Sequence, residues 1–274
     1  MKKTALFIAL SIAFFACDKK QNTTNDLTKL NLHGAIKSVL EETYMLSADL
    51  QKGEKTMDNG FDNLKLFDKN GFIVRKNLFN PEGTSAGTYI YEYDNNHLLV
   101  KETKYTPTEN IDKVYKYDYL NKRLSMQTSY TALGSVEYTD NFTYPSPALS
   151  VQECADATGN PLYKWEYEYD TNKNMTKKTW FAFGNIVFNT FVYNDINQMT
   201  EQTEITEYGA TTRWQYEYDK QGNVTSEICT YPDGTQNITV FKYEYDKQNN
   251  WIVKQIFGND IPLYQVERTM EYDE

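Results

Sequence analysis

The dominant feature of this sequence is an aromatic residue followed by aspartate, which recurs every 24 to 27 residues. Two degenerate copies, Tyr144-Pro145 and Tyr193-Asn194, keep the same rhythm. The intact copies are Phe67-Asp68, Tyr93-Asp94, Tyr117-Asp118, Tyr169-Asp170, Tyr218-Asp219, Tyr245-Asp246 and Tyr272-Asp273. Tandem repeats of this length are typical of folds in which each unit is one supersecondary element that stacks on its neighbours. The repeat therefore constrains the fold more than any other property of the chain.

The residues before each aromatic–aspartate pair alternate with a period of two. The second residue before the Tyr is aromatic or large, as at Tyr91 and Tyr167, and the residue between is commonly charged, as at Glu92, Lys116 and Glu168. A period of two places successive side chains on opposite faces of a strand, whereas a helix would scatter them. Each copy is predicted to end a β-strand that has one aromatic and one solvated face.

The residues after each pair favour a tight turn. The Asp side chain can accept the backbone N–H two residues on, and a following Gly or Asn tolerates positive φ, as in residues 68–71 and 219–223. A calcium loop is the alternative, but the acidic spacing of an EF-hand is absent and most copies carry one carboxylate. A second turn, with a Gly such as Gly159 or Gly234, lies near the middle of most units. Each unit is thus predicted to be a β-hairpin.

These units predict one β domain over residues 34–274, with about nine hairpins of roughly 25 residues and a first strand from Ile36 to Met45. Open, strongly twisted sheets rarely exceed about 10 strands without curling or splitting. We therefore expect an all-β fold in which tandem hairpins form a curled antiparallel sheet, as a spiral, partial barrel or half-shell. The helix content is expected to be very low.

The N-terminus has the pattern of an exported lipoprotein. Met1-Lys2-Lys3 precedes an uncharged stretch, Thr4 to Ala16, which is shorter than the ~20 residues of a membrane-spanning helix and fits a signal peptide. A small residue before Cys17, followed by polar residues, resembles a bacterial lipoprotein signal, although Phe14 and Phe15 depart from the usual box. The resemblance implies a signal peptide over residues 1–17 and lipidation of Cys17. An ordinary secretory signal is the alternative.

Residues 18–33 are polar and lack strand alternation, so they are predicted to form a flexible tether. The expected location is the cell envelope, as an outer-membrane lipoprotein that faces the periplasm or the surface. We expect the protein to contact the membrane through the lipid anchor only.

The motif Tyr-x-Tyr-Asp followed by an Asn or Gly turn resembles the YD repeat of RHS-type proteins over roughly residues 60–274. The copies that carry the match are Tyr91-Glu92-Tyr93-Asp94, Tyr115-Lys116-Tyr117-Asp118, Tyr167-Glu168-Tyr169-Asp170, Tyr216-Glu217-Tyr218-Asp219 and Tyr243-Glu244-Tyr245-Asp246. The whole chain looks like short YD-repeat lipoproteins of Bacteroidetes. This resemblance implies a spiral of hairpins and a role in carbohydrate or surface binding. The self-cleavage region of the large RHS shells has no counterpart here, so toxin encapsulation is not implied.

Composition argues against several functional classes. A net charge of −10 disfavours nucleic-acid binding, and 2 His and 3 Cys leave little material for a zinc site or a His-based triad. Glycosidases need a singular carboxylate pair, whereas Glu168, Glu217 and Glu244 recur as a column typical of scaffold. We therefore expect no enzymatic activity, no metal and no cofactor. Cys154 and Cys229 lie three units apart and are predicted to be unpaired, although an even number of Cys in a secreted domain argues for a bridge.

Aromatic surfaces are the remaining candidates for ligand binding. Trp180 and Trp251 lie on the return strands and are predicted to be the more exposed pair. Trp165 and Trp214 continue the register of the repeat tyrosines, which favours a place in the core, and they are weaker candidates. Flat rings could stack on sugars, so the sequence predicts a non-enzymatic binding module with a glycan as one candidate ligand. The alternative is a structural or assembly lipoprotein that docks another envelope protein.

Overall fold

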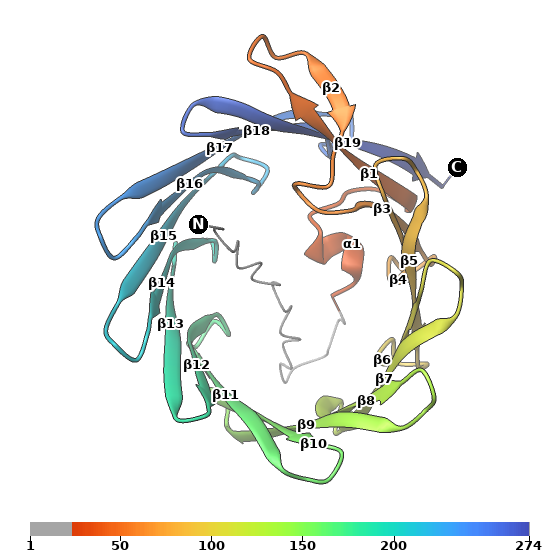
Figure 1. Cartoon of the computed structure of the whole chain (residues 1–274), viewed down its shortest axis with the longest axis vertical. Coiled ribbons are helices and arrows are strands. Elements are labelled where there is room, and N and C mark those ends of the chain that lie inside the picture. The colour runs from red at the N-terminus through yellow and green to blue at the C-terminus, as the bar shows by residue number, and fades with distance from the viewer. Residues whose placement is uncertain (1–23, 274) are drawn as a thin grey trace.

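The computed structural model describes residues 24–273, which form one short helix and nineteen strands (Figure 1). The elements in chain order are α1 (Asp26–Lys29), β1 (Ile36–Leu46), β2 (Lys52–Lys55), β3 (Asp62–Phe67), β4 (Ile73–Phe79), β5 (Ser85–Tyr93), β6 (Leu99–Tyr105), β7 (Ile111–Leu120), β8 (Arg123–Thr131), β9 (Val136–Ser146), β10 (Leu149–Asp156), β11 (Pro161–Tyr169), β12 (Met175–Ala182), β13 (Asn185–Tyr193), β14 (Met199–Ile205), β15 (Thr211–Tyr218), β16 (Val224–Thr230), β17 (Gln236–Tyr245), β18 (Trp251–Gly258) and β19 (Ile261–Tyr272). Within residues 24–273, no helix has the length and apolar character needed to cross a membrane.

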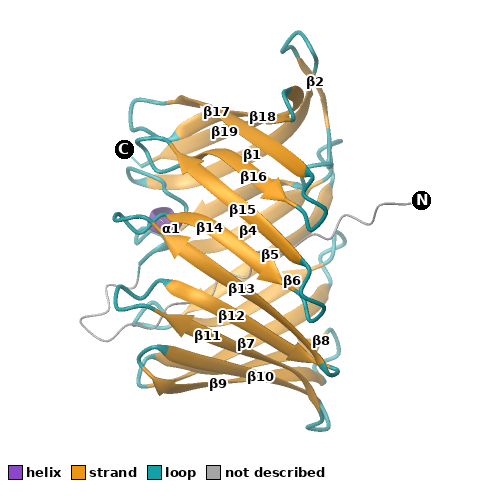
Figure 2. Cartoon of the chain, turned by 90° about the vertical axis from the view of Figure 1, so that its left-hand side faces the viewer, coloured by secondary structure: helices purple, strands orange, loops and turns teal. Residues whose placement is uncertain are grey.

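The strands form an antiparallel meander that closes into a barrel. From β3 to β19 each strand pairs with the next, and β1 completes the ring by pairing with β19 on one side and β3 on the other. The short strand β2 pairs with the end of β1, at Tyr44 and Leu46, and projects from the wall, so eighteen strands make the barrel. Figure 2 shows these strands inclined across the wall, with the turns along its two rims.

The prediction of a sheet that stays open, as a spiral or half-shell, is therefore wrong. The two ends of the meander join over a long register, from Ile36 opposite Tyr272 to Met45 opposite Tyr264. Closure pairs the backbone groups of β1 and β19, which an open sheet would leave as exposed edges.

A tyrosine near the end of most hairpins bonds across that hairpin. The Tyr93 hydroxyl donates to the carbonyl oxygen of Ile73 at 2.9 Å, and Ile73 is the first residue of β4, which pairs with β5 across the turn at Gly83. The repeat tyrosines Tyr144, Tyr193 and Tyr218 make the same bond to Leu124, Met175 and Met199. Tyr119 and Tyr243, each two residues from a repeat tyrosine, make it to Leu99 and Val224. Each acceptor lies directly after a register shift between its strand and the strand before it. These bonds therefore hold the two strands of one hairpin together at the rim that carries the Tyr-Asp turns.

The aspartate closes the turn, as the sequence predicts. Asp94 Oδ1 accepts the backbone N–H groups of Asn96 and Leu98, and Asp219 Oδ1 accepts those of Gln221 and Asn223. The third copy differs, because Asp118 lies within β7. There the turn follows at Asn121 and Lys122, both at positive φ, and Tyr119 makes the bond across the hairpin.

Residues 24–33 do not behave as the predicted tether. Asn25 caps α1 by accepting the Thr28 N–H at 3.0 Å, and α1 lies inside the ring of strands (Figure 1). Leu27 packs with Val39 and Phe67 in a buried cluster, and the backbone N–H of His33 donates to Asn250 at 2.7 Å. The signal peptide, Cys17 and the first part of the tether lie outside the described residues.

The helix α1 also establishes which face of the wall is inner. The Tyr93 hydroxyl oxygen also lies 3.2 Å from a carboxylate oxygen of Asp26 in α1, so the face that carries the repeat tyrosines points inward. Directly opposed residues of antiparallel neighbours share a face. Tyr91 and Glu102 therefore face inward, whereas Glu92 and Lys101 face outward and form an ion pair at 2.7 Å.

Candidate functional site

All four tryptophans lie on the inner face of the barrel. Trp165 and Trp214 continue the inward register of the repeat tyrosines, as predicted. Trp180 lies directly opposite Trp165 in the ladder, and Trp251 packs with Tyr243 and Tyr245. Trp251 is only 8% exposed, so the prediction that it is one of the more exposed pair is wrong, while Trp180 is half-buried.

The inner aromatic rings form a continuous group on β11 and β12. The ring centroids of Trp165 and Trp180 lie 6.3 Å apart, and those of Trp165 and Tyr167 lie 6.2 Å apart. Lys178 extends along the same face, with Nζ 4.1 Å from the Trp165 ring centroid. These rings are half-buried although they point inward, and barrels of 16 to 18 strands are wide enough to leave an aqueous interior. The inner wall thus presents aromatic surface to solvent.

A network of polar side chains lies beside these rings. Asp140, only 2% exposed, accepts hydrogen bonds from Gln152 Nε2 at 2.9 Å and from the Tyr163 hydroxyl at 3.0 Å. Gln152 in turn accepts the Tyr167 hydroxyl at 2.7 Å. The wall therefore combines stacking surface with amide, carboxylate and phenol groups of the kind that bind sugar hydroxyls.

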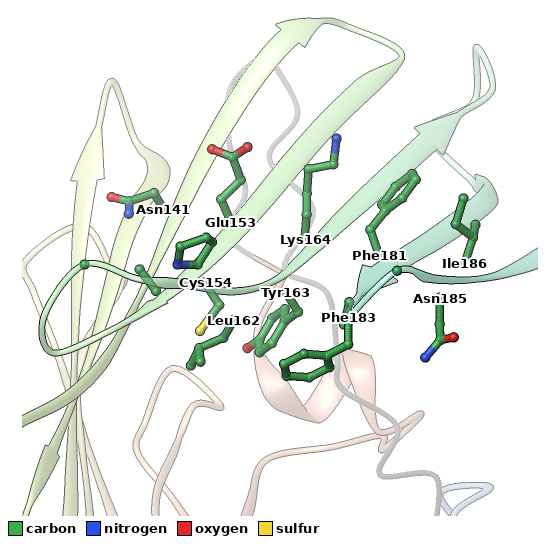
Figure 3. A pocket seen from close by; sticks show the side chains of 15 residues that line it. Asn141, Glu153, Cys154, Leu162, Tyr163, Lys164, Phe181, Phe183, Asn185 and Ile186 are labelled. Carbon is green, nitrogen blue, oxygen red and sulfur yellow. The ribbon is translucent and has the colours of Figure 1, made fainter.

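A groove of about 660 Å³ opens at the rim opposite α1, between the β10–β11 and β12–β13 hairpins. Figure 3 shows Cys154, Tyr163 and Phe183 on one side of the wall and Glu153 and Lys164 on the other. Phe183 is 87% exposed and adopts positive φ, which is uncommon for a bulky residue. The groove therefore offers an exposed aromatic ring at the mouth of the barrel.

The two cysteines in the described part of the chain are unpaired, as predicted. Cys154 and Cys229 are both free and buried on the inner face. Burial raises the pKa of the Cys154 thiol to about 11, so the thiol stays protonated at neutral pH and is a poor nucleophile.

A second group of inward side chains lies at the seam where the barrel closes. Glu41 on β1 accepts Lys65 Nζ at 2.7 Å and Arg268 Nε at 2.8 Å. The Arg268 guanidinium stacks on Trp251, with Cζ 3.4 Å from the ring centroid. Burial alone would raise the pKa of Glu41, but Lys65 and Arg268 outweigh it and hold that pKa well below its ordinary value. We call Glu41, Lys65, Lys76, Lys254 and Arg268 the seam cluster.

The seam cluster has more positive than negative charge. Lys254 faces inward opposite Tyr243, with Nζ 5.2 Å from the Trp251 ring, and Lys76 faces inward opposite Tyr89. Neither makes an ion pair or hydrogen bond with any residue between 24 and 273. Burial lowers the pKa of both lysines, and the nearby carboxylate of Glu41 offsets this effect only in part. Sequence reasoning missed the cluster because its members come from five strands.

Comparisons with known proteins find distant structural matches only. A porin-like protein from Bacteroides uniformis ATCC 8492 is similar with 11% identity, over 86% of this chain and 96% of that chain, at a TM-score of 0.43. A porin-like protein from Bacteroides vulgatus ATCC 8482 is similar with 9% identity, over 87% of this chain and 99% of that chain, at a TM-score of 0.34. The TcdB2-TccC3-TEV structure is 12% identical, over 79% of this chain and 16% of that chain, at a TM-score of 0.20.

No protein-family profile matches the chain, and no curated protein matches it. Matches as distant as these three structures assign neither a family nor a function. The resemblance to YD-repeat lipoproteins therefore stays a prediction from the sequence.

Proposed function

We propose that this protein is a lipid-anchored binding module of the bacterial cell envelope that binds carbohydrate on the inner wall of its barrel without catalysis. The observation that carries the proposal is the gathering of all four tryptophans on the inner face, where Trp165, Trp180 and Trp214 remain half-buried. Amide and carboxylate groups such as those of Gln152 and Asp140 lie beside them. Rings flanked by such groups are suited to stack on a sugar ring and bond its hydroxyls.

The outer wall supports attachment through a lipid rather than by the barrel itself. Barrels that span a membrane turn an apolar band outward. Here ion pairs lie on the outer face at Glu92–Lys101, Glu168–Lys177 and Glu201–Arg213. An Arg or Lys facing lipid costs up to about 2–4 kcal/mol at the bilayer midplane, so a wall with these ion pairs is better suited to water. Lipidation at Cys17 would then supply the membrane contact.

A glycan array probed with the full chain tests the proposal, followed by titration monitored through tryptophan fluorescence. Since the four tryptophans face inward, a bound sugar should change the emission. Trp180→Ala should weaken binding at least tenfold, if a sugar ring on the indole contributes as much as a stacked nucleic-acid base, which is worth about 1–3 kcal/mol. The matched control is Phe188→Ala, an aromatic truncation on the outer face of the neighbouring strand, where Lys177 lies over the ring.

Three results would count against the proposal. Equal losses for Trp180→Ala and Phe188→Ala would exclude the inner wall as the site. Silence on the array, with an envelope protein that co-purifies in stoichiometric amount, would favour a docking lipoprotein instead. Hydrolysis of chromogenic glycosides that one carboxylate substitution abolishes would show an enzyme.

A further inference from the structure

We infer that the seam cluster is a subsite for an acidic sugar, so that the carbohydrate bound in the barrel carries carboxylate groups. This inference rests on the proposed function and deepens it by naming the class of ligand. It is carried by cationic side chains that point inward and lie beside aromatic rings, of which Lys76 and Lys254 have no ion-pair partner among residues 24–273.

The charges of the seam do not balance. Lys65, Lys76, Lys254 and Arg268 supply four cations, and Glu41 together with the inward Glu102 supplies two carboxylates. Glu41 is already shared by Lys65 and Arg268. Burial raises the pKa of Glu102 and so disfavours its charged form. Glu41, and for Lys76 also Glu102, offset the charges of Lys76 and Lys254 only in part, since neither lysine has an ion-pair partner among residues 24–273.

Arg268 offers a specific unsatisfied donor. Its side chain is 8% exposed, its Nε atom is bonded to Glu41 and one face of the guanidinium rests on Trp251. Its Nη1 atom is buried and has no hydrogen-bond partner among residues 24–273. A buried donor without an acceptor costs free energy, and guanidinium binds carboxylate oxygens strongly. An acidic ligand would supply the acceptor that residues 24–273 do not provide.

The surroundings are suited to a sugar rather than to a small inorganic anion. The Tyr243 ring lies 6.0 Å from Trp251 between centroids, and Tyr243 is opposite Lys254 in the ladder. Half-buried aromatic surface therefore lies directly beside the unpaired ammonium group. A pyranose ring could lie on the aromatic surface while its carboxylate reaches Lys254 and Arg268.

The test compares uronate-containing oligosaccharides with the same oligosaccharides after chemical reduction of their carboxyl groups. Calorimetry on the full chain should show at least tenfold tighter binding of the acidic form. Lys254→Met should reduce this preference at least fivefold and leave binding of the reduced form unchanged. The matched control is Lys242→Met, because Lys242 also lies over an aromatic ring, Phe257 at 4.5 Å, but on the outer face.

The outcomes separate this inference from the proposed function. Equal affinity for the acidic and reduced forms would overturn the inference and leave carbohydrate binding intact. Binding of neither form would overturn both. Binding of inorganic phosphate as tightly as the uronate would also overturn the inference, since it would show a general anion site. Should Lys254→Met lower the melting temperature, Lys76→Met takes its place, and unchanged preference in that variant would refute the assignment.

Discussion

Replacing Glu41 with Gln should destabilise the barrel far more than a typical loss of an ion pair. The carboxylate joins three strands at the seam, because it bonds Lys65 on β3 and Arg268 on β19 while it lies on β1. The exposed fractions of the side chains are 18% for Glu41, 11% for Lys65 and 8% for Arg268. The variant would therefore leave two largely buried cations without their shared carboxylate. Breaking a buried pair costs about 3–5 kcal/mol. For a chain of this size, a loss of about 3 kcal/mol corresponds to a fall in melting temperature of roughly 6–12 °C.

The control for this prediction is Glu92→Gln, which removes an outward ion pair to Lys101. Glu92 is 51% exposed, and surface pairs contribute about 0–1 kcal/mol. Urea unfolding and thermal melts of the two variants, monitored by circular dichroism, should differ clearly. If Glu41→Gln were no more destabilising than Glu92→Gln, the seam cluster would not be assembled as described.

The same carboxylate predicts the sign of a pH effect. The pKa of Glu41 is depressed in the folded state, so its contribution to stability is complete above the ordinary value of 4.5 and is lost as the pH falls through the folded value. The stability advantage of the wild-type chain over Glu41→Gln should therefore be constant near neutral pH and shrink below about pH 4.5. An advantage that grew on acidification would contradict the assigned ion pairs.

Three further predictions test the repeat, the helix and the buried Cys154 thiol. Tyr218→Phe should lower the free energy of unfolding by about 1 kcal/mol, because it removes the 2.7 Å hydrogen bond to the Met199 carbonyl. Tyr216→Phe is the control and should cost little, since the Tyr216 hydroxyl makes no hydrogen bond within residues 24–273. Equal effects of the two substitutions would refute a stabilising role of the Tyr218 bond. Gly71→Ala should speed hydrogen exchange at the Leu27 N–H, which donates to the Gly71 carbonyl, because the added Cβ would lie 2.5 Å from Asn25 Nδ2. Gly83→Ala is the control and should leave α1 unchanged, since Gly83 has a similar positive φ and a Cβ added there would have no atom within 4 Å. Cys154 should react with a thiol reagent at pH 8 only after unfolding, since burial raises its pKa to about 11, and reaction at the same rate in the native protein would contradict its burial.

Much of the local structure follows from the sequence because it is encoded within single units. The alternation at Tyr91, Glu92 and Tyr93 defines an inner and an outer face, and Asp94 defines the turn that follows. Closure could not be predicted, because β1 and β19 meet only after the accumulated twist and tilt of the whole meander bring them together. No local pattern in either strand names the other as its partner.

The helix and the seam cluster were missed for different reasons. The helix α1 has only four residues and is held by contacts to Gly71 and Val39 rather than by its own periodicity. The cap residue Asn25 was the available indication. The seam cluster forms only when the barrel closes, which no single unit encodes. The available indication was Lys254, which lies opposite Tyr243 on the aromatic face, because a charged residue on that face departs from the pattern of the repeat.

Joining of the first and last strands is the claim on which the rest depends, and a paired-cysteine measurement tests it most directly. Leu40 on β1 lies directly opposite Thr269 on β19. In the closed barrel the variant Leu40→Cys with Thr269→Cys should form an intramolecular disulfide under mild oxidation, seen as a mobility shift that reductant reverses. In an open meander the two positions would lie about 80 Å apart along the sheet, at about 4.8 Å per strand, and the disulfide would not form. Near-complete cross-linking is expected in the folded chain, and its absence there would contradict the barrel.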